Sequence, residues 1–165
     1  MISLLAGGLL AVGSSLIGIA VRRHYRQRHE IYFEICGFIV LLKNEISFLK
    51  TPLKAVINEF AEGRKGITVN ALKKYSDDLD HGKIDNNYAE TLELSPLNIK
   101  EKNELAKFLR SLGKLPMKEQ LGELANFEAK FSELEKKTAE ESKRLGGMYF
   151  KLCVLLGIAL MVVVM

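Results

Sequence analysis

Residues 1–28 read MISLLAGGLLAVGSSLIGIAVRRHYRQR, an uncharged run that stops abruptly at a cluster of arginines. The first 21 residues comprise 14 apolar residues, four glycines and three serines, with no charged side chain. As a helix, this run would reach about 30 Å at about 1.5 Å per residue, which matches the hydrocarbon core of a bilayer. The stretch therefore predicts a transmembrane helix over residues 1–21.

The basic residues that follow the apolar run predict its orientation. Positive residues beside a span stay on the cytoplasmic side, so the N-terminus is expected outside. This anchor consists of Arg22, Arg23, Arg26 and Arg28. A cleaved signal peptide is one alternative, although that class carries its positive charge before the apolar run. A buried helix of a soluble domain is the other alternative.

The C-terminal end of the sequence has the same pattern. Its last 14 residues have no polar side chain, and extension back to Leu145 gives a run of about 31 Å. The basic flank of this run consists of Lys143, Arg144 and Lys151. We therefore expect a second transmembrane helix over residues 145–165, both termini outside, and a cytoplasmic domain over residues 22–144.

The region between the two runs is predicted to be an all-α bundle. Apolar residues recur at spacings of three and four, and turn residues separate these segments. Thr51-Pro52 breaks the first long helix, because the residue before a proline disfavours helical geometry. Thr68 is expected to cap a helix, and Asn98 with Glu101 fits a capping box. The apolar positions are Ile31, Ile35, Phe38, Leu42, Ile46, Leu49, Leu53, Val56, Ile57, Phe60, Val69, Leu72, Tyr75, Leu79, Ile84, Tyr88, Leu92, Leu105, Phe108, Leu109, Leu112, Met117, Leu121, Leu124, Phe127, Phe131 and Leu134.

Composition and motif content argue against an enzyme, a cofactor and a metal centre. Removing the four anchor arginines from the 24 basic residues leaves 20, which the 20 acidic residues balance. Nucleic-acid binding is therefore not expected. The sequence has no phosphate-binding glycine loop, nucleophile elbow or paired-cysteine zinc motif. Cys36 and Cys153 are expected to stay reduced, because a cytoplasmic domain seldom keeps a disulfide.

Small residues form a stripe along the first run, at spacings of four, three and four, which lets another helix approach closely. The stripe consists of Gly7, Ala11, Ser14 and Gly18. One candidate neighbour is the second span, and the other is a helix of a partner protein. The small residues of the second span are Gly146, Cys153 and Gly157. The sequence leaves both neighbours open.

Motifs spread over the whole chain resemble one known family. After the N-terminal span with its basic stop come LKNEI at residues 42–46, TPLKA at 51–55 and FLRSLG at 108–113. Gln120 and the glycine-marked terminal span follow. In this order the motifs resemble the stage III sporulation protein AB family. Two departures are Leu115-Pro116, where an aspartate is usual, and Tyr88, where a tryptophan is usual.

The resemblance implies a membrane platform in the channel complex that joins the mother cell to the forespore during endospore formation. The family is similar to inner-membrane platform proteins of type II secretion and type IV pilus machines, whose helical cytoplasmic domains contact a motor ATPase. The implied partners are the stage III sporulation protein AA ATPase, other channel-complex membrane proteins and membrane lipid, in the mother-cell-derived outer forespore membrane. Self-association stays open. The alternative is a structural subunit of another envelope machine without ATPase contact.

On this resemblance, the motor should meet an exposed helix end beside a break in the bundle. Two corners fit, at residues 45–54 and 110–120. The expected contact residues are Glu45, Lys54, Arg110, Lys114 and Gln120. The last three are expected to be exposed, and Arg110→Glu is expected to weaken ATPase binding without lowering the melting temperature. The simpler interpretation is that Thr51-Pro52 and Leu112-Gly113 only end helices.

Overall fold

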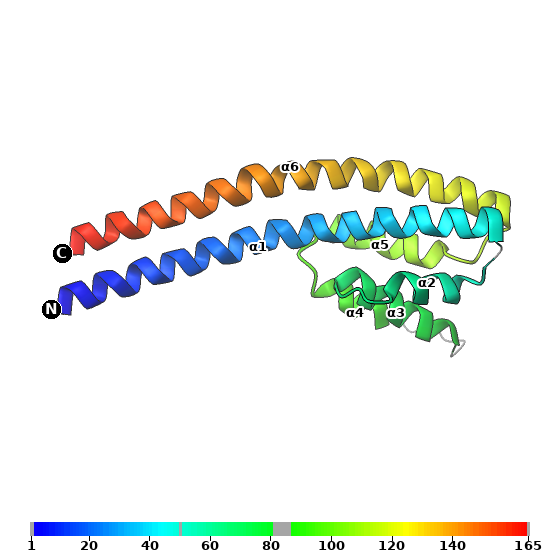
Figure 1. The fold of residues 1–165 in the computed structure, drawn as a ribbon, viewed down its shortest axis with the longest axis horizontal. Coiled ribbons are helices and arrows are strands. Elements are labelled where there is room, and N and C mark those ends of the chain that lie inside the picture. The colour runs from blue at the N-terminus through cyan, green and yellow to red at the C-terminus, as the bar shows by residue number, and fades with distance from the viewer. Residues whose placement is uncertain (1, 50, 81–86, 165) are drawn as a thin grey trace. The chain divides into compact units, whose positions relative to one another are not determined.

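The computed structural model describes residues 2–49, 51–80 and 87–164, and within these ranges it contains helices and turns but no strand (Figure 1). The predicted all-α class is confirmed. The elements are α1 (Ile2–Asn44), the π-helical turn η1 (Glu45–Leu49), α2 (Leu53–Ala61), α3 (Ile67–Asp80), α4 (Asn87–Glu93), α5 (Ile99–Ser111) and α6 (Met117–Val164). The expected helix break at Thr51-Pro52 is present between η1 and α2.

The chain divides into two compact units. The paired-helix unit comprises Met1–His29 and Lys136–Met165, and the bundle unit comprises Glu30–Glu135. Helices α1 and α6 therefore each contribute residues to both units. Contacts between helices do not locate a bilayer, so the limits of the two spans at residues 21 and 145 stay predictions.

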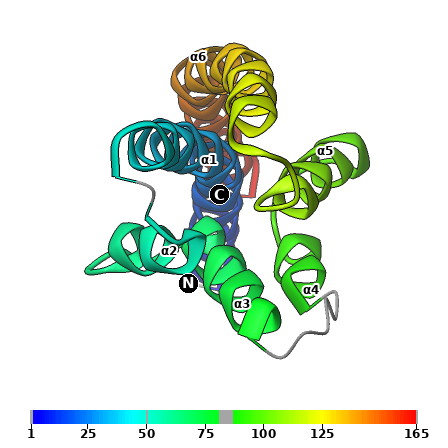
Figure 2. The ribbon, with the colours of Figure 1, turned by 90° about the vertical axis from the view of Figure 1, so that its right-hand side faces the viewer.

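Figure 2 shows the helices of the bundle unit from one end. A cluster of aromatic rings joins four of them. The ring of Phe38 in α1 lies 5.3 Å from that of Phe60 in α2 and 6.4 Å from that of Phe108 in α5. Phe108 in turn lies 5.7 Å from Phe131 in α6. These four side chains are at most 3% exposed. Steep edge-to-face pairs of this kind add about 0.5–1.5 kcal/mol each beyond their burial, so the cluster fixes four helices to one another.

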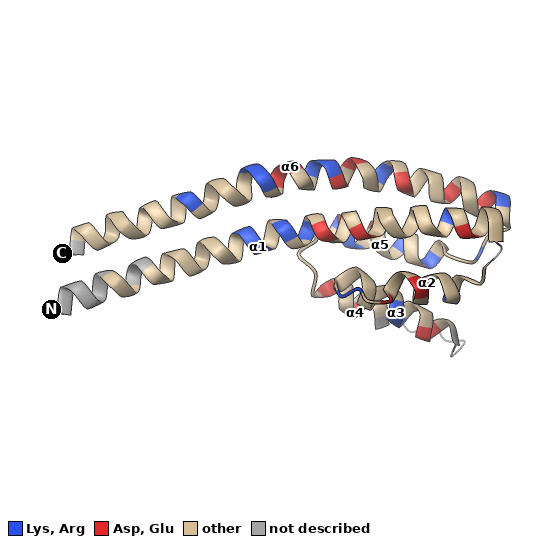
Figure 3. Cartoon of the chain, viewed as in Figure 1, with Lys and Arg blue, Asp and Glu red and all other residues tan. Residues whose placement is uncertain are grey.

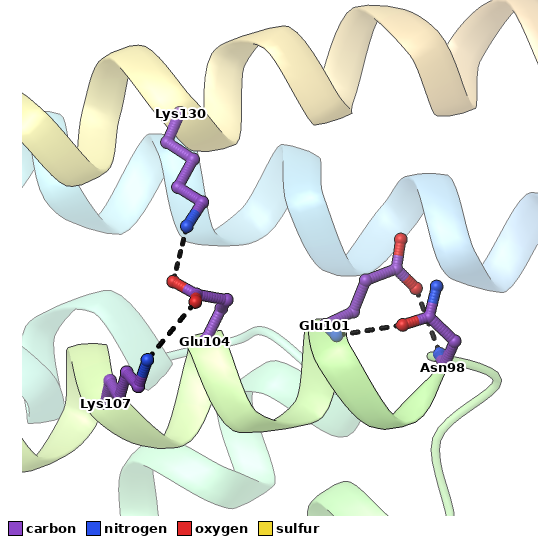
Figure 4. A network of polar contacts seen from close by, with 5 residues as sticks. All are labelled: Asn98, Glu101, Glu104, Lys107 and Lys130. Atoms are coloured by element: carbon purple, nitrogen blue, oxygen red, sulfur yellow. Dashed lines mark hydrogen bonds and ion pairs between the residues drawn. The ribbon is translucent and has the colours of Figure 1, made fainter.

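The predicted capping box begins α5 (Figure 4). Asn98 Oδ1 accepts a hydrogen bond from the Glu101 backbone at 2.9 Å, and Glu101 Oε2 accepts one from the Asn98 backbone at 3.0 Å. One turn further on, Glu104 accepts hydrogen bonds from Lys107 in the same helix and from Lys130 in α6. The Lys130 hydrogen bond is the main cause that lowers the pKa of Glu104. Local sequence therefore sets where α5 starts, and an ion pair links it to α6.

Two expectations for α3 are wrong. Thr68 does not cap the helix, because α3 begins at Ile67 and the Gly66 carbonyl already accepts a helical hydrogen bond from Asn70. A side-chain cap at Gly66 has no room, since even a Cβ there would lie 2.8 Å from a Glu34 oxygen. Leu79, expected on the apolar face, is 39% exposed near the end of the helix. Ile84 lies outside the described residues.

One helix among the described residues is long and apolar enough to cross a membrane. It is Met117–Val163, whose most apolar 18-residue window has a mean hydropathy of 2.0 and is 11% buried. Residues 145–163 of the predicted C-terminal span lie in this helix. Several side chains of the N-terminal run lie outside the described residues, so the span over residues 1–21 stays a prediction.

Candidate protein-interaction site

The first predicted corner is the elbow where α1 ends. It contains η1, and π-helical turns are rare and are frequently found at functional sites. Thr51 Oγ1 donates a hydrogen bond to Glu45 Oε2 at 2.5 Å, which ties the chain back onto η1. Pro52 then stands at the N-cap position of α2. Phe48, which is 81% exposed, and the exposed Leu49 belong to η1.

The second corner is the loop between α5 and α6. Leu112 is the C-cap of α5, and Gly113 follows with a φ of +73°, a conformation that suits glycine because it has no Cβ. The Tyr75 hydroxyl donates to the Leu112 carbonyl at 3.0 Å and holds this loop against α3. Burial, with a further contribution from Tyr88, raises the pKa of Tyr75 to about 12, so this donor keeps its proton.

Both corners line one cavity of about 250 Å³. Its lining residues are Leu42, Ile46, Thr51, Leu53, Gly113, Leu115, Met117 and Gln120. Pockets for cofactors and drug-sized ligands measure about 300–1,000 Å³, so this cavity has the size for a single large side chain. The structure thus joins two corners that are about 60 residues apart in the sequence into one site, which we call the corner cavity.

Gln120 was expected to lie on the surface, but its side chain is buried. It is 4% exposed, and neither Oε1 nor Nε2 of its side chain has a hydrogen-bond partner among the described residues. The prediction was wrong because Gln120 lies four residues before Leu124 and eleven before Phe131, both of which are buried. Residues at these spacings share one face of a helix, so Gln120 belongs to the core-facing stripe of α6.

The other predicted contact residues lie in different settings. Glu45 is half-buried, whereas Lys54, Arg110 and Lys114 are exposed. Arg110 Nε donates a hydrogen bond at 2.9 Å to the hydroxyl of Tyr88, whose side chain is buried. Arg110 lines a separate cavity between α4 and α5 and is absent from the lining of the corner cavity. Its position therefore indicates a structural role.

The corner cavity has an apolar rim that the sequence analysis missed. Leu115 and Met117 line the cavity and are themselves exposed. Phe48 and Leu49 of the elbow are also exposed but are absent from the lining. Leu49 and Met117 were expected to face the core, as parts of helical stripes. Both lie at the end of a helix beside a proline. Leu49 ends η1 shortly before Pro52, and Met117 begins α6 directly after Pro116. An apolar residue at such an end has no further turn of helix to pack against. The apolar residues beside these breaks are the feature of the sequence that could have predicted the rim.

The predicted basic anchor lies on both helices of the paired-helix unit (Figure 3). Its exposed members are Arg22, Arg23, Arg26, Lys143, Arg144 and Lys151. Arg28 differs from them, because it is half-buried and its Nη1 donates to Glu141 Oε2 at 2.5 Å. Arg28 therefore joins α1 to α6 in addition to its predicted role in the anchor.

Small residues bring the same two helices close together. A Cβ placed on Gly18 would lie 3.1 Å from the Cβ of Cys153 and in contact with Phe150. Nearby, the rings of Tyr25 and Tyr149 stack with their centroids 6.3 Å apart. Of the other small residues, Gly146 packs near Arg22 and Tyr25, Gly157 is buried, Ser14 is half-buried, and the side chains of Gly7 and Ala11 lie outside the described set. At Gly18, the neighbour is thus the second apolar helix.

Glu34 and Cys36, whose pKa values are also shifted, are absent from the lining of the corner cavity. Burial is the main cause that raises the pKa of Glu34, and burial also raises the pKa of Cys36 to about 11. Within the described part of the chain, no three side chains of the metal-binding types come together. The features that gather at the corner cavity are apolar surface and an amide, which suit binding to another protein.

Comparison with known families identifies the family of this chain. The family model described as stage III sporulation protein AB matches residues 3–165, which include both corners, the basic anchor and the terminal apolar helix. Neither a curated protein nor a solved structure matches the chain.

Proposed function

Because the chain belongs to the stage III sporulation protein AB family, we propose that it is a membrane platform that docks a cytoplasmic motor ATPase. Family membership itself places its role in stage III of sporulation, within a family of structural sporulation proteins. The proposal adds that the platform belongs to the channel complex between the mother cell and the forespore. It would reside in the outer forespore membrane, which derives from the mother cell.

Two sets of residues support the proposed membrane topology. The apolar stretch of α6 and the uncharged N-terminal run would form the two spans, and exposed basic residues follow the first run and precede the second. Basic residues beside a span favour the cytoplasmic side. On this topology both termini lie outside and residues 22–144 face the mother-cell cytoplasm, where a motor ATPase can reach them.

The corner cavity and its apolar rim are the observation that carries the docking step. Exposed apolar residues around a pocket of side-chain size are typical of a protein-interaction centre, where a few anchors supply most of the binding energy. Leu115 and Met117 are the apolar side chains that both line the cavity and are exposed to such a partner. The proposed partner is the stage III sporulation protein AA ATPase.

Co-purification of the full-length protein with this ATPase in mild detergent tests the proposal. We expect the wild type to retain the ATPase, and the Leu115→Ala and Met117→Ala variants each to weaken binding about tenfold, as for an interface anchor. Leu94→Ala is the matched control, because Leu94 is 86% exposed but lies outside the corner cavity. Retention of the ATPase by every variant would contradict this docking site. Failure of the wild type to retain it would favour a structural subunit of another envelope machine.

A further inference from the structure

The Gln120 side chain is the feature of the corner cavity that the fold does not explain. Both of its polar atoms are buried without a hydrogen-bond partner among the described residues, and its neighbours in the lining include Leu42, Ile46 and Leu53. Leaving a buried amide unpaired destabilises a protein, and such groups in native structures call for a partner. A partner that binds in the cavity can supply the missing hydrogen bonds.

The chemistry of an amide restricts what that partner is. The Gln120 side chain offers a carbonyl acceptor and two N–H donors, so a full match needs a donor and an acceptor side by side. A carboxylate or a phosphate only accepts, and would leave Oε1 unpaired. A backbone peptide group presents both functions. The remaining volume, within a cavity of about 250 Å³ lined mostly by apolar residues, fits the apolar side chain of the same peptide segment.

Charges beside the rim indicate the character of the flanking residues. Lys114 and Lys118 are exposed and adjoin the rim residues Leu115 and Met117 in the sequence, and Glu119 is the neighbouring exposed carboxylate. Residues 114–119 therefore carry a net positive charge. Opposite charges across an interface steer association and fix its orientation, so the approaching segment should carry acidic side chains.

We infer that the corner cavity receives one apolar side chain from an acidic peptide segment of a partner protein, whose backbone peptide group pairs with the Gln120 amide. This inference rests on the proposed function, which makes that partner the motor ATPase. Gln120 then acts as a contact residue from a buried position, and the exposed lysines contact the flanking carboxylates.

Two measurements on the full-length protein test the inference. First, a photo-crosslinking phenylalanine analogue replaces Met117 in sporulating cells, with the same analogue at Leu94 as control, and the crosslinked ATPase peptide is sequenced by mass spectrometry. We expect an apolar residue flanked by Asp or Glu. Second, affinity for the purified ATPase is compared between the wild type and Gln120→Met. We expect a loss of about tenfold or more and no fall in melting temperature, because methionine has similar volume and leaves no polar atom unpaired.

The outcomes separate this inference from the proposed function. If the wild type retains the ATPase but Gln120→Met binds it equally well, the inference is wrong and docking stands. A crosslinked segment without acidic residues, or a lower melting temperature for Gln120→Met, also overturns it. If the wild type does not retain the ATPase, the proposed function fails and the inference fails with it.

Discussion

The Thr51 hydroxyl donates a hydrogen bond to the Glu45 carboxylate across 2.5 Å, and this contact closes the elbow between η1 and α2. Thr51 also lines the corner cavity, so the contact links the shape of that cavity to the end of α1. Thr51→Val keeps the side-chain shape but removes the donor. We expect it to lower the free energy of unfolding by about 1–2 kcal/mol, because a hydrogen bond to a charged group is lost. Chemical denaturation of the full-length protein in detergent measures this change in the free energy of unfolding. Asn58→Ala, at an exposed position of α2, is the control, and equal stability of the two variants would contradict the account.

Gly113 provides a prediction about the second corner. Its φ of +73° disfavours any side chain, and a Cβ there would also lie 3.4 Å from Leu53. Gly113→Ala should therefore lower the free energy of unfolding by about 1–2 kcal/mol. The matched control is Gly122→Ala in α6, where a Cβ has nothing within 4 Å. That change should raise stability by about 0.5–1 kcal/mol, because alanine favours helix. Similar effects at the two glycines would show that the loop is not held as described.

The close approach at Gly18 can be tested with a disulfide. In a Cys36→Ser background, Gly18→Cys would face Cys153 with a Cβ separation of 3.1 Å before any adjustment. Disulfides need about 3.5–4.5 Å, a distance that a small outward shift reaches. Mild oxidation should therefore remove both thiols within one chain, detected by alkylation and intact mass. Gly13→Cys is the control, since a Cβ there has nothing within 4 Å. Oxidation that produces only chains linked to one another would contradict the intramolecular pairing.

Arg110 and Lys114 should respond differently to charge reversal. The hydrogen bond from Arg110 to the buried Tyr88 changes the earlier expectation, because Arg110→Glu removes a structural contact as well as a surface charge. We expect Arg110→Glu to lower the melting temperature. Lys114→Glu should leave the melting temperature unchanged and weaken ATPase binding, since Lys114 is exposed beside the corner cavity. Thermal melts and affinity measurements on both variants decide this. Equal binding by Lys114→Glu and wild type would remove Lys114 from the site.

Cys36 gives a prediction about pH. Burial, followed by the nearby Glu135 and Glu128 carboxylates, raises its pKa from 9.0 to about 11. In a Cys153→Ser variant, the rate of alkylation by iodoacetamide should keep rising through about pH 11, because the thiolate is the reactive form. The same shift makes the folded state lose stability as pH rises from about 9 toward 11, where the unfolded thiol ionises first. An alkylation rate that levels off near pH 9 would contradict the burial of this thiol.

Features set by neighbouring residues could be predicted from the sequence. The break at Thr51-Pro52 follows from the geometry of proline, and the start of α5 follows from Asn98 and Glu101, which satisfy one another within a single turn. Both are local, so no knowledge of the fold was needed. Thr68 shows the limit of this reasoning, because its role depends on Glu34, which lies on another helix and approaches the backbone at Gly66.

The candidate site could be predicted only in part. Both corners were chosen as breaks between helices, but their meeting at one cavity depends on how η1 and the start of α6 pack together. Gln120 was expected to be exposed because glutamine is polar, although its spacing to Leu124 places it on the core-facing stripe. Arg110 was expected to be an exposed contact residue and is exposed, but its hydrogen bond to Tyr88 depends on the placement of α4. These outcomes depend on tertiary packing, which the spacing of residues does not specify.

A detergent pull-down of the intact protein from sporulating cells, followed by mass spectrometry, tests the central claim most directly. We expect a motor ATPase and other membrane proteins of the channel complex to stay bound, and Met117→Ala to release the ATPase while the membrane proteins remain. Recovery of the protein alone, or only with lipid, would contradict the platform function.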